Sequence, residues 1–315
     1  MTVDVRRYGP ELASDWQSLL ADSRNGLFLF DRAYMDYHSD RFPDFSAIAY
    51  VDGRAAVAIP ATRRDGRDEA FSHSGLTFGG FIIRRDLRGE AALACIDALL
   101  DAMRDWGAAE LEVRLLPQFL AAYPSAEADY ALWRRGFTLV RRDLSSALPL
   151  RERHLAFNTS KKQAVAKAKK AGLAISSGRL ADFHALLGTV LEERHGVAPV
   201  HSLEELELLG SRFPDRIFLR SVERDGQMLA GIVVYRYPTA WHTQYMAASD
   251  EGRKLGALDF VVAELIEEAT ESGANWLSFG TSTTGQGHHL NEGLLWQKES
   301  FGARSVVHDF MRGKL

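Results

Sequence analysis

The chain has 315 residues, a formal net charge of −4 and a hydrophobic fraction of 46%. This length allows two domains of ordinary size, each with its own core, and the composition is typical of a soluble globular protein. The negative charge argues against binding a long polyanion through overall charge, although a local basic patch still attracts phosphate. No stretch approaches the roughly 20 apolar residues of a membrane span.

Cysteine content and the N-terminal segment indicate a reducing compartment. Cys95 is the only cysteine in the sequence, which excludes an internal disulfide. Its apolar neighbours predict a small core residue rather than a reactive thiol. The N-terminal segment MTVDVRRYGPELASDW lacks the apolar region of a secretory signal. We therefore expect a cytoplasmic protein.

In chain order, the first predicted elements are a hairpin, a helix and a strand. Residues 45–62 read as two strands joined by an Asp-Gly turn at 52–53, a dipeptide that type I′ turns favour. Residues 89–107 have apolar side chains at helical spacing and end at Gly107, which suits a left-handed C-cap. The following segment, AAELEVRLL, predicts a strand. Together these elements form an α+β unit.

A helix of different character follows. Residues 158–173, NTSKKQAVAKAKKAGL, contain good helix formers, a capping residue at Asn158 or Thr159, and Gly172 to end the helix. The segment carries five lysines and no acid. Two interpretations stay open. It is either a solvated helix that covers the junction of two units or an electrostatic platform for the phosphates of a nucleotide-linked substrate or of RNA.

The second half repeats the order of elements of the first. Residues 217–236 read as a hairpin around a second Asp-Gly pair, at 225–226. Residues 257–273 predict an amphipathic helix that ends at Gly273, and the next segment, ANWLSFG, predicts a strand. Each half then carries a Leu-Trp pair before a Gly/Phe pair and a last strand, with the Leu-Trp pairs at 132–133 and 295–296.

Five elements in the same order predict an internal duplication. We expect a first unit over residues 1–155 and a second unit over residues 156–315, with the basic helix opening the second unit. The oligomeric state has no marker in the sequence.

The order of these elements resembles the GNAT acyltransferase fold, and two such units around a basic segment resemble the Fem-like branch of that superfamily. This branch includes FemAB-type peptidoglycan aminoacyltransferases and FemAB-like acetyltransferase-type proteins. Three stretches carry the resemblance: SHSGLTFGGF at 72–81, SKKQAVAKAKKAGL at 160–173, and WLSFGTS at 276–282 with LNEGLLWQKESFGA at 290–303. The resemblance implies an α+β protein with mixed sheets and two tandem GNAT-like units across the chain.

The resemblance also implies an activity. It indicates an N-acyltransferase that moves an acyl group from acetyl-CoA or another acyl-CoA to a small-molecule amine, with an acceptor in cell-envelope or polysaccharide synthesis. An aminoacyl-tRNA is the family's other donor, so a tRNA-dependent FemAB-type aminoacyltransferase is the alternative. A third reading is a non-catalytic binding module on the same scaffold, because a fold does not fix a function.

One segment is similar to the loop with which GNAT enzymes hold the pyrophosphate of acyl-CoA. That loop reads Arg/Gln-x-x-Gly-x-Gly/Ala, and the matching residues here run from Arg253 to Leu258. Leu258 departs from the pattern, since a small residue belongs there. A helix N-terminus with nearby cations attracts phosphate in any case. The candidate donor-binding residues are Arg253, Lys254, Gly256 and Ala257.

Residues 279–302 supply candidate catalytic side chains. Acyl transfer to an amine needs a base, donors for the developing oxyanion and a grip on both substrates. His289 or Glu292 is the candidate base, with Asn291 between them. Lys298 is a candidate to bind a substrate carboxylate or phosphate, or to stabilise the oxyanion. The competing interpretation is an exposed polar loop. We expect no metal, because no third ligand lies at a recognisable spacing from the two histidines.

Further residues are candidates for substrate binding. In the strand that leads to the second amphipathic helix, alternation places His242 and Gln244 opposite Tyr245. In the first unit, the two glycines of SHSGLTFGGF serve either a groove or only a tight turn. The candidate substrate-binding residues are His73, Phe78, Gly79, Gly80, His242, Tyr245, Thr281 and Ser282.

Overall fold

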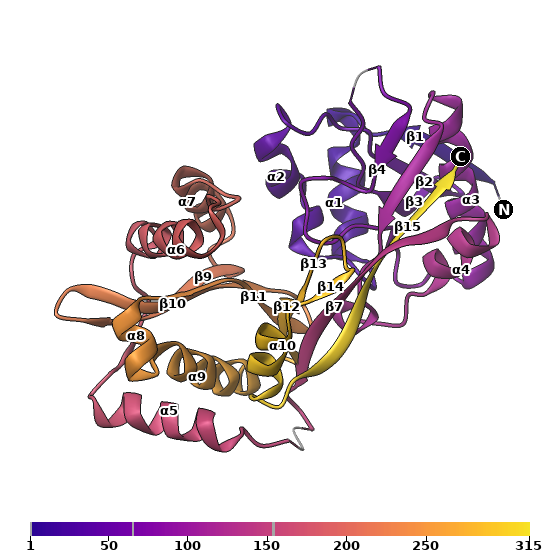
Figure 1. The fold of residues 1–315 in the computed structure, drawn as a ribbon. Coiled ribbons are helices and arrows are strands. Elements are labelled where there is room, and N and C mark those ends of the chain that lie inside the picture. The colour runs from indigo at the N-terminus through magenta and orange to yellow at the C-terminus, as the bar shows by residue number, and fades with distance from the viewer. Residues whose placement is uncertain (1, 65, 153–154) are drawn as a thin grey trace. The chain divides into compact units, whose positions relative to one another are not determined.

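The structure, a computed structural model, describes residues 2–64, 66–152 and 155–315 (Figure 1). The chain forms two compact units. The first comprises the chain up to Asp143 together with Gly285–His288 and Val307–Leu315, and the second comprises Leu144–Thr284 and His289–Val306. No helix among the described residues is long and apolar enough to cross a membrane.

The first unit combines an antiparallel sheet with part of a mixed sheet. The antiparallel sheet has the order β1-β2-β3-β5, with β1 at Val3–Arg7, β2 at Ala47–Val51, β3 at Arg54–Ile59 and β5 at Ile82–Ile83. In the mixed sheet β6 pairs parallel to β4 and antiparallel to β15, with β4 at Glu69–Phe71, β6 at Glu110–Arg114 and β15 at Arg304–Lys314. The helices are α1 (Ala13–Ala21), α2 (Arg32–Met35), α3 (Gly89–Asp105) and α4 (Glu127–Arg134), and the short 3₁₀ turns are Pro10–Leu12, Phe28–Phe30, Asp36–His38 and Gln118–Leu120.

The second unit is a mixed sheet between helical layers. Its strand order is β7-β12-β11-β10-β9-β8, with β7 at Thr138–Pro149, β12 at Trp276–Thr281, β11 at Ala240–Ala248, β10 at Gln227–Arg236, β9 at Ile217–Arg224 and β8 at Ile175–Ser176. Figure 1 shows α6 and α7 on one face of this sheet, and α9 with α5 on the other. The helices are α5 (Thr159–Lys170), α6 (Leu180–His195), α7 (Leu203–Arg212), α8 (Asp250–Leu255), α9 (Ala257–Glu271) and α10 (Glu292–Glu299).

Two strands contribute residues to both units. Strand β7 passes from the first unit to the second at Asp143, and β15 passes back to the first at Val307. Strand β15, at the C-terminal end of the sequence, therefore pairs with β6 from the first half of the sequence.

The local structure follows the chemistry expected of the two hairpins and the two long helices. Both Asp-Gly turns are left-handed, with φ of 48° and 81° at residues 52–53 and 51° and 77° at residues 225–226. The helices α3 and α9 are followed by Gly107 and Gly273, which also have positive φ, of 91° and 80°. Each helix precedes a strand that pairs in parallel, β6 with β4 and β12 with β11. The predicted repetition of elements is confirmed.

The basic segment forms the predicted helix, α5. The side chain of Asn158 accepts a hydrogen bond from the backbone N–H of Lys161, and Gly172 follows the helix at a φ of 72°. The helix packs along α9 in the core of the second unit, with Ala168 fully buried.

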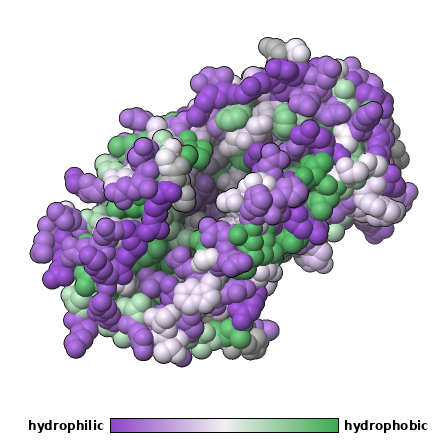
Figure 2. All heavy atoms as spheres, in the orientation of Figure 1, coloured by the Kyte–Doolittle hydropathy of each residue, from purple (hydrophilic) through white to green (hydrophobic). Residues whose placement is uncertain are grey.

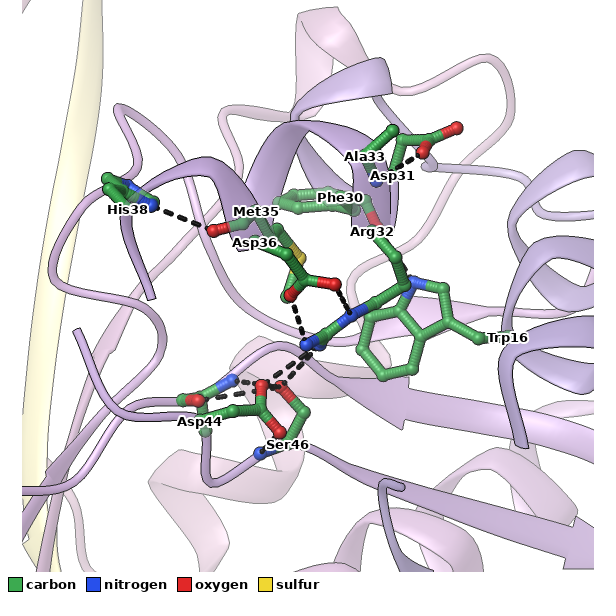
Figure 3. Close-up of polar contacts among 11 residues, drawn as sticks. Trp16, Phe30, Asp31, Arg32, Ala33, Met35, Asp36, His38, Asp44 and Ser46 are labelled. Carbon is green, nitrogen blue, oxygen red and sulfur yellow. Dashed lines mark hydrogen bonds and ion pairs between the residues drawn. The ribbon is translucent and has the colours of Figure 1, made fainter. Parts of the chain in front are cut away.

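A buried arginine organises polar side chains in the first unit (Figure 3). The guanidinium of Arg32 donates to the carboxylates of Asp36 and Asp44 at 2.5 Å and 2.9 Å. It also lies 3.9 Å from the ring centroid of Tyr8 and 5.4 Å from that of Trp16. Arg32 is 8% exposed, so this cation is neutralised inside the unit and serves its packing.

Two local features differ from expectation. The polar residues after Gly280 form a small hairpin instead of an open loop, with β13 (Thr283–Thr284) paired to β14 (His289–Leu290). In β11 a bulge at Gln244 interrupts the pairing with β10, so the simple alternation expected for residues 242–245 does not run through this strand.

Candidate functional site

Strands β11 and β12 in the second unit pair over only three residues each. Their parallel pairing covers Ala240–His242 on β11 and Trp276–Ser278 on β12. Both strands continue beyond these pairs, to Ala248 and Thr281. The later residues of β11 therefore have no described strand partner on the side of β12. Their backbone N–H and C=O groups are the kind that a ligand in an extended conformation can bind.

A pocket of about 370 Å³ opens at this edge, and we refer to it as the β11 pocket. Its apolar wall comes from α6 and from residues 246–248 of β11, and α10 adds Leu294 and Gln297. Three cations line it: Arg194 on α6, Arg253 on α8 and Lys161 on α5. A volume of this size, with apolar walls and a few polar groups, is typical of small-molecule sites.

The turn between α8 and α9 forms part of the pocket. Gly256 has a φ of 74°, which L side chains rarely adopt. A Cβ atom there would lie 2.5 Å from the carbonyl oxygen of Ala164 on α5. Glycine is therefore required both by the backbone and by the close approach of α5. The predicted amphipathic helix of residues 257–273 is confirmed as α9, which begins directly after Gly256.

Arg253 is held at the margin of the pocket by its own neighbours. Its guanidinium donates to the carbonyl oxygen of Ala248 at 2.6 Å and pairs with the carboxylate of Asp250. Lys254 is exposed and does not line the β11 pocket. Figure 2 shows hydrophilic side chains over α8 and the end of the β9–β10 hairpin. Ala257 is fully buried at the start of α9, so its contribution to a ligand site is limited to its backbone.

An ion pair lies beside the Gly256 turn. The ammonium of Lys161 on α5 is 2.6 Å from the carboxylate of Asp259 in the first turn of α9. This acid already interacts with the positive end of the helix dipole. Arg194 forms no ion pair with any described residue. It is therefore the cation at this pocket that has no described counter-ion for its charge.

Lys298 on α10 is buried and fully hydrogen-bonded. Its ammonium donates to the carbonyl oxygens of Gly280 and Thr281 at 2.9 Å and 2.6 Å, and to the hydroxyl of Ser282 at 2.9 Å. Only 2% of Lys298 is exposed, and this burial lowers the pKa of its amine to about 7. The amine is close to a balance between its charged and neutral forms at neutral pH, and it fixes the end of β12.

The other three catalytic candidates lie at the surface. His289 on β14 is exposed, as are Asn291 and Glu292. The side chain of Asn291 accepts a hydrogen bond from the N–H of Leu294 and caps α10. The structure thus separates three exposed polar residues from one buried lysine. Their catalytic roles stay predictions.

Residues of β11 form a second polar cluster, which includes a histidine missed in the sequence. The ring nitrogen Nδ1 of His201 is 2.5 Å from the hydroxyl of Tyr245, and His201 is 7% exposed. Burial raises the pKa of Tyr245 to about 12. Nδ1 of His242 lies 3.0 Å from the hydroxyl of Ser278, at the last pair of the β11–β12 ladder. The sequence shows only that His201 precedes a helix cap.

The two hydroxyl residues after Gly280 have structural partners. Ser282 is 1% exposed, and its backbone N–H donates to the carbonyl oxygen of Leu144 at 2.7 Å. The hydroxyl of Thr281 is 2.8 Å from that of Thr283. Both residues therefore order the entry to the β13–β14 hairpin.

The candidates in the first unit are packed inside that unit. His73 is 2% exposed with a φ of 65°, and burial lowers its pKa to about 3. A Cβ atom on Gly79 would lie 2.3 Å from the carbonyl oxygen of Ser72, and Gly80 has a φ of 92°. The ring of Phe78 contacts that of His308, with centroids 5.2 Å apart. The glycines are therefore explained by a tight turn, and a role in substrate binding stays a prediction.

The lysines of α5 divide into two groups. Lys161 and Lys169 form ion pairs with acids of α9, the second with Glu264 at 2.9 Å. Lys162, Lys167 and Lys170 are exposed. The first group attaches the helix to the domain, and the second leaves a basic outer face.

Comparisons with known proteins identify the fold. Residues 158–288 match the family model described as an acetyltransferase (GNAT) domain. A structure described as FemX is similar over 99% of this chain and 97% of its own, with a TM-score of 0.72 and 13% identity. A search of curated proteins finds no match.

Two other solved structures share the fold. One is the C-terminal domain of a putative lysylphosphatidylglycerol synthetase from Agrobacterium fabrum, with a TM-score of 0.62, 11% identity, and coverage of 96% of this chain and 91% of its own. The other is a tandem GNAT protein from the clavulanic acid biosynthesis pathway, with a TM-score of 0.53, 12% identity, and coverage of 99% and 98%. The chain therefore shares its fold with these FemX and tandem GNAT structures, and its residues 158–288 match the GNAT acetyltransferase domain.

Proposed function

We propose that the second unit binds an acyl-CoA in the β11 pocket and transfers the acyl group to an amine. One observation carries this proposal: the β11–β12 ladder ends at His242, and the unpaired edge of β11 leads to the Gly256 turn. An extended acyl-pantetheine arm has the length and polarity to bind along this edge. Arg194 and Arg253 lie where the diphosphate of the donor would bind.

The transfer needs no redox step. The lone pair of the acceptor amine attacks the thioester carbonyl carbon, the C–N bond forms, and the C–S bond breaks. The attacking nitrogen loses a proton to a base, and the departing thiolate takes up a proton. Backbone N–H groups on the unpaired edge of β11 are suited to stabilise the oxyanion. His289 and Glu292 remain the proposed bases, and the His201–Tyr245 pair is a further candidate for proton transfer.

Lys298 supports this site by holding the end of β12. Its three acceptors lie at Gly280, Thr281 and Ser282, directly after the point where β12 leaves β11. A pKa of about 7 also allows the amine to stabilise a negative charge or release a proton. We therefore propose a positioning role for Lys298 together with an electrostatic one.

The acceptor is proposed to be a small-molecule amine of cell-envelope or polysaccharide synthesis, in a cytoplasmic enzyme. The resemblance of residues 72–81, 160–173 and 276–303 to Fem-like proteins is the basis for this class of acceptor. An aminoacyl-tRNA donor is the second candidate, and the observation that favours it is the basic outer face of α5, formed by Lys162, Lys167 and Lys170.

Calorimetric titration with acetyl-CoA and with CoA tests the donor. We expect both to bind and to raise the melting temperature, because a ligand that binds only the native state stabilises it. Arg194→Ala and Arg253→Ala should each weaken binding several-fold. Lys254→Ala is the matched control, since it removes a cation of α8 that does not line the pocket.

Three outcomes separate the alternatives. Binding of neither ligand, or equal losses in Lys254→Ala and Arg253→Ala, would contradict the proposed donor site. Binding of an aminoacyl-tRNA that is lost in a Lys162→Ala/Lys167→Ala/Lys170→Ala variant would favour the tRNA-dependent reaction. Binding of acetyl-CoA without release of free thiol across a panel of amines would favour a binding module.

A further inference from the structure

A second pocket, of about 430 Å³, lies within the first unit. Its lining comes from residues 41–43, from the segment after β3, from β4 and from Ser74. Four arginines line it, and Glu69 is the single acid among the lining residues that the structure describes. We refer to it as the arginine pocket. The lining cations are Arg41, Arg63, Arg64 and Arg67.

One of these arginines is fixed by the fold. Nε of Arg63 donates to the carbonyl oxygen of Arg67 at 2.6 Å, and Nη1 donates to the carbonyl oxygen of Trp106 at 2.9 Å. Its guanidinium lies 5.3 Å from the ring centroid of Phe45. Neither carbonyl oxygen neutralises the charge, so Arg63 presents a pre-positioned cation to the pocket.

Two further arginines have no counter-ion among the residues that the structure describes. Arg64 and Arg67 are exposed and form no ion pair with any residue in the described ranges. The acid of the pocket, Glu69, is 3.8 Å from Arg312. The whole chain has a net charge of −4, so this concentration of positive charge opposes the overall sign. A concave surface of one charge focuses its field on a ligand of the opposite charge.

The other residues that line the arginine pocket are apolar, aromatic or hydroxyl-bearing, and they indicate which chemical groups accompany the phosphate in a ligand. Phe42, Pro43 and Phe71 supply apolar and aromatic surface. The hydroxyl of Thr62 donates to that of Ser74 at 3.2 Å and accepts from the N–H of Ser74, also at 3.2 Å. The pocket thus combines guanidinium groups, hydroxyls and aromatic faces, a set that suits a phosphate group joined to a flat or apolar moiety.

We propose that the arginine pocket is a binding site for a phosphate-bearing small molecule, with the phosphate between Arg63, Arg64 and Arg67 and the apolar part against Phe42 and Phe71. Such a site requires no acyl transfer, so the test of this proposal is independent of the function proposed for the second unit. The shared chemistry of the ligands is a phosphate dianion or a diphosphate, from either the free anion or an ester that carries a ring.

The test is calorimetric titration of the full chain with inorganic pyrophosphate and, separately, with uridine diphosphate. We expect both to bind at low ionic strength, with an affinity that falls as salt rises. An Arg64→Ala/Arg67→Ala variant should bind pyrophosphate at least about tenfold more weakly, because charge-assisted hydrogen bonds are the strong ones in such sites. Both side chains are exposed, so the variant should unfold at the wild-type temperature.

Matched controls make the outcome decisive. Arg85→Ala/Arg88→Ala removes the same charge from two exposed positions of the same unit that do not line the pocket, and it should bind pyrophosphate like the wild type. Phe71→Leu should weaken uridine diphosphate but leave pyrophosphate unchanged if the ring contacts the ligand. Equal losses of pyrophosphate affinity in the two double-arginine variants would show that only the overall charge matters, and this would overturn the proposal. Absence of pyrophosphate binding to the wild type would overturn it as well.

Discussion

Lys161 on α5 and Asp259 on α9 form an ion pair with an N–O distance of 2.6 Å, and their side chains are 10% and 20% exposed. The lysine is also 5.0 Å from the ring centroid of Phe301. A basic helix that looks solvated in the sequence is therefore fixed at its first turn to the start of α9. The attachment lies beside the Gly256 turn and the β11 pocket.

We expect Lys161→Ala to lower the free energy of unfolding by about 2–3 kcal/mol, because it leaves a largely buried carboxylate without its partner. Urea denaturation measures this change. Lys169→Ala is the matched control on the same helix, and its pair with Glu264 is 59% and 39% exposed. It should cost less than about 1 kcal/mol. Similar losses in the two variants would show that the Asp259 pair has no special role.

We expect Gly256→Ala to destabilise the protein by more than about 2 kcal/mol and to weaken acetyl-CoA binding. The added Cβ would lie 2.5 Å from a backbone oxygen of α5 while the residue keeps its left-handed conformation. Gly172→Ala provides the control. It has a similar φ of 72° but no atom within 4 Å of its Cβ, so only the conformational cost of about 1 kcal/mol applies. Thermal denaturation of both variants measures the difference.

Lys298 should make the free energy of unfolding depend on pH in the neutral to alkaline range. Its pKa is lowered to about 7 in the folded protein, so between this value and the ordinary pKa the unfolded chain binds a proton that the folded chain releases. The unfolding free energy of the wild type should therefore rise with pH from about 7 to 10, by up to about 1.4 kcal/mol per pH unit, relative to Lys298→Met. Lys254→Met, at an exposed position, should track the wild type. A constant difference between wild type and Lys298→Met would contradict the lowered pKa.

His308 should contribute to acid destabilisation. It is 6% exposed, its Nε2 has no hydrogen-bond partner among the described residues, and burial lowers its pKa to about 4. Unfolding exposes the imidazole, which then takes up a proton below about pH 6.5. The neutral His308 therefore stabilises the folded state above about pH 6.5, and this contribution to the unfolding free energy is lost as the pH falls toward 4. His308→Phe should flatten the profile between pH 6.5 and 4, whereas His288→Phe, at an exposed position of the same unit, should leave it unchanged.

Features set by a few neighbouring residues could be predicted from the sequence. The Asp-Gly turns, the glycines after α3 and α9 and the Asn158 cap depend on local backbone preferences, and each occurs where expected. The same kind of local rule, that of helix capping, applies to Asn291 at the candidate site. An Asn directly before a helical segment is a cap, and that local role accounts for its side chain.

The geometry of the site depends on contacts between distant segments, and no local rule reveals these. The separation of β11 from β12 after His242 is a property of the sheet. The bulge at Gln244 shifts the faces that alternation would assign. Burial of Lys298 requires α10 to pack on the end of β12, and the contact of His201 with Tyr245 joins residues far apart in the sequence. Charged side chains are rarely buried, so the sequence alone favours an exposed position for a lysine such as Lys298.

The pairing of β15 with β6 affects when the sheet of the first unit is completed during synthesis. Residues 310–314 pair with Glu110–Arg114 of β6, so that edge of β6 has no partner until these much later residues have been made. At bacterial and eukaryotic elongation rates, roughly 10 to 40 s separate the emergence of the two strands from the ribosome. An unpaired strand edge favours association with other chains during that interval. The first half of the chain therefore lacks this partner for β6 until residues 310–314 have been made.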